Sequence, residues 1–142
     1  MSKEQEMAAS AEAWLRGKLP NEEVDKAVNA LRSQKAADKI SMGGSVICAI
    51  FYWRIHLEGH GHYYNGNAGG IGGFGAASTN GDIYTDDINR LYAEAYSFQF
   101  NSAAVYLNVN FFNRNSQFLG HYHGGGVGTC IGSGGGTGSW GP

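Results

Sequence analysis

The sequence predicts a mainly β protein: an eight-stranded antiparallel β-barrel with one short internal helix, preceded by a helical N-terminal extension. The composition combines 23 glycines, eight Tyr, seven Phe and three Trp with only 15% charged residues. This combination is typical of short strands joined by tight turns. The hydrophobic pattern also changes near Ile40, from a helical period to an alternating one. We therefore divide the 142 residues into an extension, residues 1–40, and a barrel domain, residues 41–142.

The extension holds most of the Lys and Glu residues and predicts two amphipathic helices. Gly17 and Pro20 end the first helix, and Asn21 is the expected N-cap of the second. Each helix has an apolar stripe, formed by Met7, Ala11, Trp14 and Leu15 in the first and by Val24, Ala27, Val28 and Leu31 in the second. Two interpretations stay open: the helices dock on the domain or fray from it, or they act as a docking or export handle.

The first strands are expected between residues 46 and 77. Residues 46–55 predict one strand with two apolar faces, which is central in the sheet or covered by the extension. Glu58-Gly59 begins a turn, and residues 60–64 return as a second strand. Asn65-Gly66-Asn67 predicts a hairpin turn, and residues 71–77 a glycine-laced strand.

The internal helix is expected to follow Thr85-Asp86-Asp87, with Thr85 or Asp86 as its N-cap. Further strands are predicted at residues 97–100, 105–111, 118–122, 127–131 and 137–140, with a turn at 113–116. Residues 105–111 show the clearest alternation, that of a half-buried strand with a core face made of Val105, Leu107, Val109 and Phe111. About eight strands favour a barrel, because closure removes exposed sheet edges.

The two cysteines, Cys48 and Cys130, have no metal or redox spacing. Both lie in apolar, strand-like runs, which favours buried free thiols. A disulfide would require their strands to be neighbours with suitable geometry.

Two histidine pairs are the candidate metal ligands: His60 with His62, and His121 with His123. Residues i and i+2 share one face of a strand, so that each pair could chelate zinc or copper if the two strands were adjacent. The alternatives are simple exposure beside turns, or a pH-sensing role in which all five histidines gain charge together in acid.

Other chemistry finds little support in the sequence. Residues 70–75 match G-x-G-x-x-G but lack the strand–helix context of a nucleotide site, and no G-x-S-x-G motif is present. The net charge of -2 gives no basic surface for nucleic acid. We therefore expect no enzymatic activity, nucleotide or cofactor. Whether aromatic side chains form an exposed patch stays open for Tyr63, Tyr64, Phe74, Tyr106, Phe112 and Tyr122.

Four stretches carry a resemblance to a known family: residues 81–92, 104–112, 118–121 and 134–140. They read GDIYTDDINRLY, AVYLNVNFF, FLGH and GGGTGSW. Together they resemble the core domain of the rhodococcal virulence-associated (Vap) proteins, over roughly residues 41–142. The resemblance implies an eight-stranded antiparallel barrel with one short helix, a filled interior and no established catalytic site. Family members are secreted into the host vacuole, and a membrane target has been proposed for some.

The N-terminus departs from the family pattern of a secretory signal followed by a variable stretch. Here the first residues are polar and acidic, with no apolar segment of signal-peptide type. We expect synthesis in the cytoplasm without a cleavable signal, and export by a specialised secretion system. The expected function is that of a monomeric, non-enzymatic effector acting on a membrane or a host or target-cell protein through its barrel surface. The alternative is a cytoplasmic binding or immunity-like partner that docks through its N-terminal helices.

Overall fold

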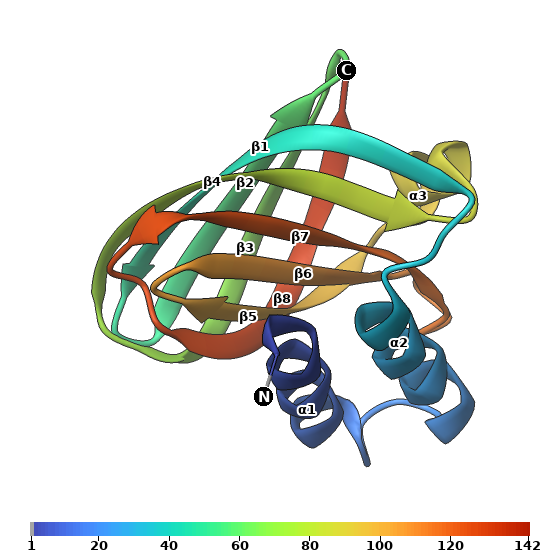
Figure 1. Cartoon of the computed structure of the whole chain (residues 1–142), viewed down its shortest axis with the longest axis horizontal. Helices are drawn as coiled ribbons and strands as arrows, with labels where there is room; N and C mark the ends of the chain where they lie inside the picture. Colours follow the sequence, from blue (N-terminus) through green and yellow to red (C-terminus); the bar gives the residue numbers. More distant parts are fainter. Residues whose placement is uncertain (1) are drawn as a thin grey trace.

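The computed structural model describes residues 2–142 as a closed β-barrel with a helical hairpin against its outer wall (Figure 1). The elements are α1 (Lys3–Leu15), α2 (Asn21–Ser33), β1 (Asp38–Ala49), β2 (Tyr52–Gly59), β3 (His62–Gly72), β4 (Phe74–Thr85), α3 (Ile88–Glu94), β5 (Ser97–Ala103), β6 (Tyr106–Phe112), β7 (Phe118–Gly128) and β8 (Gly132–Gly141). Around the barrel the order is β1-β2-β3-β8-β5-β6-β7-β4, and β4 pairs with β1. All pairs are antiparallel, which confirms the predicted fold class.

Large side chains fill the barrel interior. Trp53, Tyr64, Phe100, Phe111 and Tyr122 are fully buried there, and the ring centroids of Trp53 and Phe100 lie 4.6 Å apart. Aliphatic side chains from β1, β2, β4, β6 and α3 complete the core. The interior is thus a packed core rather than a ligand cavity.

The apolar run at residues 46–55 forms two strands rather than the predicted single one. Ile50 has a positive φ of 56° and lies with Phe51 in the turn between β1 and β2, where Ala49 pairs with Tyr52. The run lacks Gly, Asn or Pro, so the usual signals of a tight turn are missing. The outer face of β1 is also uncovered, because Ile47 is exposed.

Two glycine-containing segments are also placed differently from the prediction. Asn65-Gly66-Asn67 lies inside β3, and the turn falls at Gly73, within the predicted strand 71–77. Packing explains the first difference: a Cβ on Gly66 would lie 2.6 Å from the Phe98 ring. Gly66 therefore makes room for a core side chain rather than for a turn.

The total of eight strands is confirmed, but four strands follow α3 where five were predicted. The segments 118–122 and 127–131 were predicted as separate strands, whereas β7 runs without a break from Phe118 to Gly128. In β6, Leu107, Val109 and Phe111 are core residues as predicted. Val105 is not, because it lies exposed in the β5–β6 turn.

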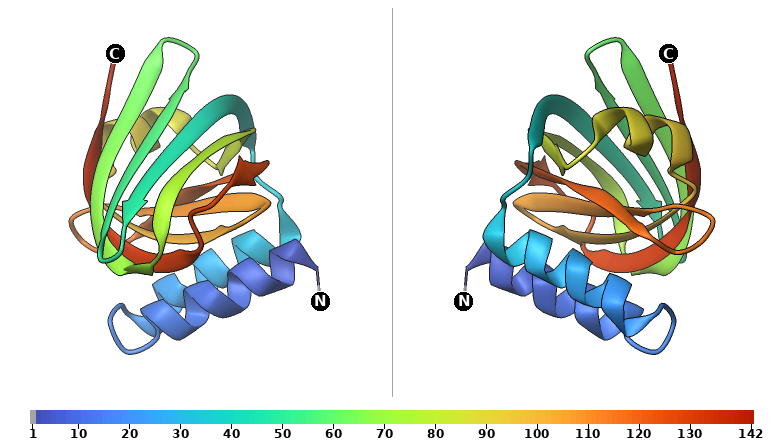
Figure 2. Two further views of the ribbon diagram at one scale, coloured as in Figure 1. Left: turned by 90° about the vertical axis from the view of Figure 1, so that its left-hand side faces the viewer. Right: turned by 90° about the vertical axis from the view of Figure 1, so that its right-hand side faces the viewer.

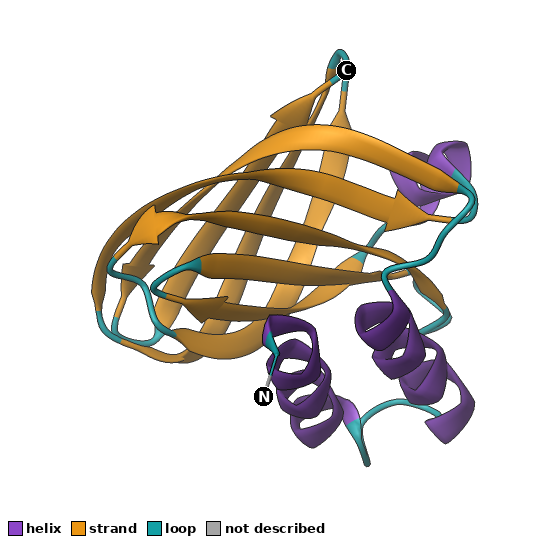
Figure 3. Cartoon of the chain, in the orientation of Figure 1, coloured by secondary structure: helices purple, strands orange, loops and turns teal. Residues whose placement is uncertain are grey.

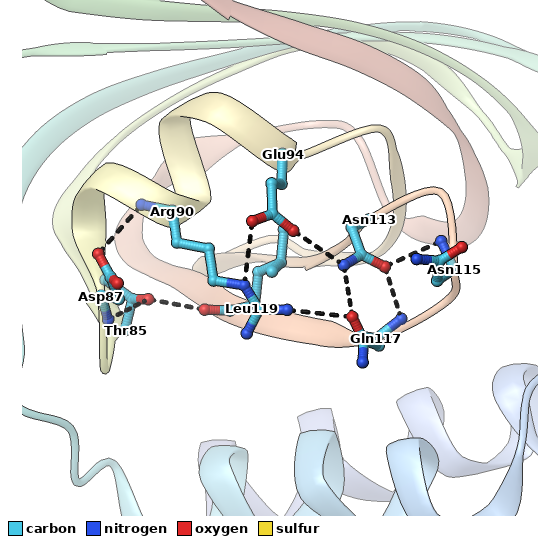
Figure 4. A network of polar contacts seen from close by, with 8 residues as sticks. All are labelled: Thr85, Asp87, Arg90, Glu94, Asn113, Asn115, Gln117 and Leu119. Carbon is cyan, nitrogen blue, oxygen red and sulfur yellow. Dashed lines mark hydrogen bonds and ion pairs between the residues drawn. The ribbon is translucent and has the colours of Figure 1, made fainter.

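The helix caps are shifted by one or two residues from their predicted positions. Asn21 is the first residue of α2, and Pro20 precedes it as N-cap without a side-chain hydrogen bond. Asp87, not Thr85 or Asp86, caps α3, since its carboxylate accepts the Arg90 N–H at 3.1 Å (Figure 4). Thr85 Oγ1 donates instead to the Leu119 carbonyl at 2.6 Å, which fixes β4 against β7.

The α1–α2 hairpin lies across the outer face of β5, β6 and β7 (Figure 2). A second core forms there between the two apolar stripes and the outward side chains of Tyr106 and Phe112. Both faces of β6 are therefore buried, and the prediction of a half-buried strand was wrong. Of the interpretations that the sequence leaves open, the structure shows the helices docked on the barrel rather than frayed from it. No helix within residues 2–142 is long and apolar enough to cross a membrane.

Cys48 and Cys130 form a disulfide, so the prediction of free thiols was wrong. The Cα atoms are 6.0 Å apart, although the residues are separated by 82 positions in sequence. Strand β4 lies between β1 and β7 in the barrel. The turn from β7 to β8 carries Cys130 past that strand to Cys48, a contact that strand adjacency alone does not reveal.

Candidate functional site: an apolar end of the barrel

Four hairpin turns meet at one end of the barrel, on the left in Figure 3. They connect β1 to β2, β3 to β4, β5 to β6 and β7 to β8. Backbone hydrogen bonds join the first two turns, from Ile50 N to Gly73 O at 3.0 Å and from Gly70 N to Phe51 O at 3.3 Å. Thr129 N donates to Ala76 O at 3.0 Å and ties the fourth turn to β4. Gly126 N donates to Val105 O at 3.2 Å and ties the third turn to β7, so that the four turns form one continuous surface.

This surface is apolar. Seven large apolar side chains on it are between 42% and 75% exposed: Ile47, Ile50, Phe51, Ile71, Phe74, Val105 and Ile131. We call this set the apolar end. Single exposed apolar residues are ordinary on a protein surface, but a contiguous group marks a contact site for a protein or a membrane.

The turns of the apolar end also carry no charge, and the exposed Arg54, which pairs with Ile47 across β1 and β2, lies at its edge. The segments that build it, residues 47–53, 69–81, 102–112 and 124–137, contain no Asp, Glu, Lys, Arg or His. Tyr52 is half-exposed beside it, and its hydroxyl donates to Asn67 Oδ1 at 2.7 Å. An uncharged surface loses little favourable hydration when it leaves water, so the electrostatic cost of burying it is small.

The apolar end is backed by the core. The disulfide joins Cys48, next to the first turn, to Cys130 in the fourth. Strands β3 and β8 pass directly over Trp53, where a Cβ on Gly72 would overlap the indole ring. Glycine at this position lets the backbone pack on the ring, and the turns are held on a fixed support.

The structure places the two histidine pairs on opposite parts of the barrel. His60 lies in the β2–β3 turn, and His62 begins β3, where its ring stacks on Tyr92 at 3.9 Å. His121 and His123 lie on β7, which is not a neighbour of β3. The pairs therefore do not meet. Within residues 2–142 no group of three or more His, Cys, Asp or Glu side chains is placed to hold a metal ion.

The histidines on β7 are also poor sensors of mild acid in the folded protein. Burial, aided by the neighbouring His123, lowers the pKa of His121 to about 3. Burial is likewise the main cause that lowers the pKa of His123. The hypothesis that all five histidines gain charge together therefore fails for His121 while the hairpin covers it.

A cleft of about 460 Å³ lies between α2, the start of β7 and the segment before α3. Its polar groups already have structural partners: Asp86 Oδ1 accepts the Ala37 N–H, and Asp87 caps α3. Arg90 bonds to Glu94 and Gln117, and Lys26 to Glu23 (Figure 4 draws the Arg90 contacts). Of the charged side chains that line the cleft, three are cationic and two are anionic.

Comparison with known proteins identifies the family. A family model described as Rhodococcus equi virulence-associated protein matches residues 1–141. The chain belongs to this family. The match extends over the helical extension, beyond the residues whose motifs carried the resemblance.

Two solved Vap structures share this fold. Virulence-associated protein VapB from the intracellular pathogen Rhodococcus equi is 40% identical with a TM-score of 0.68, and the match covers 73% of this chain and 96% of that one. VapD from the same organism is 34% identical with a TM-score of 0.70, covering 73% of this chain and 97% of that one. No curated protein sequence matches the chain. Each match thus covers almost the whole of the VapB or VapD chain and leaves about a quarter of this chain unmatched. That fraction is similar to the fraction of residues before β1.

The apolar end was not predicted from the sequence. Of the six aromatic residues considered for a patch, only Tyr63 and Phe74 are exposed, whereas Tyr64, Tyr106, Phe112 and Tyr122 are buried. The available signal was the absence of charge in four separate segments of a Vap barrel. It becomes meaningful only when the topology brings these segments to one end.

Proposed function

We propose that this Vap-family protein is a non-enzymatic effector that acts on a membrane through the apolar end of its barrel. The observation that supports this proposal most is the grouping of seven exposed apolar side chains on and beside four turns that contain no charged residue. Membrane-facing protein surfaces have these properties, with apolar side chains below the lipid headgroups and Tyr at their level. Tyr52 has such a position at the edge of the apolar end.

Hydrophobic transfer of this surface is sufficient for reversible binding. Full burial of a Phe or Ile side chain contributes roughly 1.5–3 kcal/mol. Phe51, Ile71 and Phe74 are each more than two-thirds exposed, so most of that contribution is available to a contact. Because no cationic side chain lies in the turns, the proposed binding does not depend on anionic lipid.

The alternative function, partner binding through the N-terminal helices, has a different requirement. The apolar stripes of α1 and α2 are buried on the protein's own barrel. Docking to a partner would need either the polar outer faces of the helices or their release. The exposed apolar end needs neither, which favours it as the contact surface.

The test is flotation of the full chain with vesicles of pure phosphatidylcholine and of an equal mixture with phosphatidylglycerol, together with dye leakage from both. We expect binding to both compositions. The double variant F51S/F74S should bind at least about 30-fold more weakly, since it loses about 2 kcal/mol or more of transfer free energy. The control is Y63S, which removes an exposed aromatic side chain outside the apolar end.

The membrane proposal would be contradicted by no flotation with either vesicle, by equal flotation of F51S/F74S and wild type, or by a loss in Y63S equal to that in F51S/F74S. Binding only to the phosphatidylglycerol vesicles would also contradict it, because the charge-free turns have no preference for anionic lipid. If flotation fails, capture of a target-cell protein that is lost in F51S/F74S would assign the apolar end to a protein partner instead.

A further inference from the structure

The α1–α2 hairpin covers an unusual surface, a buried ladder of side-chain amides. Gln99 and Asn101 on β5 face Asn110 and Asn108 on β6, and all four are at most 2% exposed. Alternation along β6 places Asn108 and Asn110 on the same face as Tyr106 and Phe112, which touch the hairpin. The ladder therefore lies beneath the hairpin and not inside the barrel.

The amide ladder satisfies its own hydrogen bonds. Asn101 Nδ2 donates to Asn108 Oδ1 at 2.9 Å, Asn110 Nδ2 to Gln99 Oε1 at 2.9 Å, and Asn108 Nδ2 to the Tyr122 carbonyl at 3.1 Å. Amides that already pair with one another also hydrate readily. Uncovering the amides is therefore less costly than uncovering apolar side chains of the same area, and the cost of release comes from the apolar stripes of the hairpin with Tyr106 and Phe112.

Two polar contacts fasten α2 to β7. The Glu23 carboxylate, nearly buried, accepts the Phe118 N–H at 2.9 Å. At the other end of the helix, Gln34 Nε2 donates to Leu31 O at 2.7 Å, which turns Gln34 Oε1 toward His121 Nε2 at 3.3 Å. This orientation assigns the imidazole proton to Nε2. Nδ1 is then a buried acceptor, and it has no hydrogen-bond partner among residues 2–142.

The surroundings of His121 oppose a positive charge on it. The imidazole of His123 on the same strand repels a positive charge on His121. Tyr84 from β4 stacks on the His121 ring with a centroid distance of 5.1 Å. Lys39 of β1 lies over the Tyr84 ring, with its Nζ 5.7 Å from the ring centroid. The cleft beside His121 is lined by three cationic side chains, Lys26, Lys35 and Arg90. It is also lined by two anionic ones, Asp86 and Asp87, which lie just before α3. Both of these carboxylates already bond to backbone N–H groups.

His123 has its own charged neighbours. Glu4 and Lys3 reach it from α1, and Asp82 from β4. Glu4 and Asp82 favour its charged form, but burial outweighs them and its pKa remains lowered. Both β7 imidazoles are thus kept neutral by the cover that α1 and α2 provide.

We propose that the α1–α2 hairpin is a detachable cover over β5, β6 and β7, closed while His121 is neutral and released in acid. Release lets water reach His121 and His123 so that both can take up a proton. The share of this chain that VapB and VapD leave unmatched, about a quarter, is similar in size to the part of the chain before β1, which agrees with a barrel that folds around its own core. This device is independent of the membrane proposal for the apolar end.

The direction and size of the effect follow from proton linkage. His121 has an ordinary pKa of 6.5 when hydrated and a pKa of about 3 when covered. The released form therefore binds more protons at every pH between these values, and falling pH favours it. From pH 7.5 to pH 5, His121 alone raises the equilibrium constant for release about 30-fold.

The test is amide hydrogen exchange of the full chain at about pH 7.5, about pH 6 and about pH 5, corrected for the intrinsic chemical rate. We expect the protection of α1 and α2 to fall at least about 10-fold between the extremes, while β1, β2 and β3 keep theirs. In H121Q, whose amide can still donate to Gln34 but does not titrate, most of this loss should disappear. The matched control is H60Q, a change in the β2–β3 turn that should leave the wild-type profile intact.

The proposal would be overturned if the protection of α1 and α2 stayed unchanged down to pH 5. It would also be overturned if the helices and the barrel strands lost protection together. A loss that begins only below about pH 4.5 would assign the effect to Glu23 rather than to His121. If the barrel strands of H121Q are not protected at pH 7.5, the wild-type profile still decides, because proton uptake by His121 favours release as soon as pH falls below about 6.5. The apolar end takes no part in this measurement, so a failed vesicle assay does not affect it.

Discussion

Glu23 and Phe118 join the N-terminal extension to the barrel. They lie 95 positions apart, and the Glu23 carboxylate accepts the Phe118 N–H at 2.9 Å while Lys26 pairs with its other oxygen at 3.0 Å. Burial alone would raise the pKa of Glu23, but the Phe118 N–H and Lys26 outweigh it and hold the pKa below its ordinary value. The contact therefore stabilises the docked hairpin above that ordinary value and is lost as pH falls further.

Replacing Glu23 with Ala should destabilise the docked hairpin by about 1–3 kcal/mol, because the Phe118 N–H loses a charged acceptor near the barrel surface. Urea unfolding followed by circular dichroism measures this loss at neutral pH. The neighbouring E22A changes an exposed carboxylate of the same helix turn, so it should lose less than about 1 kcal/mol. Equal losses in the two variants would show that helix propensity, not the contact with Phe118, is responsible.

The Cys48–Cys130 disulfide should contribute about 2–4 kcal/mol to stability, since it closes a loop of 82 residues in the unfolded chain. Urea unfolding with and without a thiol reductant measures this contribution. C48S/C130S should unfold at the reduced protein's midpoint and show no response to reductant. If reduction leaves the wild-type midpoint in place, the crosslink has no stabilising role.

The fold was largely predictable because its main signals are local. Alternation at residues 107–111 indicates which side chains enter the barrel core, and helical stripes at Val24 and Leu31 indicate which helix face is buried; the structure confirms both. The turn at Ile50-Phe51 was not predictable from these signals, since apolar residues occupy it. Its cause is tertiary: the turn is hydrogen-bonded to Gly73 from the next hairpin.

The candidate site was less predictable than the fold, because it depends on which turns meet in space. Phe51, Phe74 and Ile131 come from three different hairpins, and no sequence spacing relates them. The disulfide was missed for the same reason, since Cys130 reaches Cys48 through a turn and past an intervening strand. The histidine pairs were regular in sequence, yet β3 and β7 lie apart in the barrel.

Glycine at position 136 should be essential for pairing β3 with β8. A Cβ there would overlap the Asn67 carbonyl on the paired strand, and backbone cannot yield as a flexible side chain can. G136A should cost about 3 kcal/mol or prevent folding. The matched change G73A places the same methyl group where nothing lies within 4 Å, and it should leave the unfolding midpoint within about 0.5 kcal/mol of wild type. Comparable losses would mean that the glycines act through chain flexibility instead of close strand approach.

Mild acid should destabilise the whole protein through His121. The folded-state pKa of about 3 lies below the ordinary 6.5, so that the unfolded chain binds the extra proton between these values. The stabilisation is complete above about pH 6.5 and declines as pH falls toward 3, with about 2 kcal/mol lost by pH 5. Urea unfolding of wild type and H121Q at about pH 7.5 and about pH 5 tests this, and H121Q should show a much flatter dependence. A wild-type midpoint that stays constant across this range would mean that His121 is hydrated in the folded protein, and the hairpin would then not be its cover.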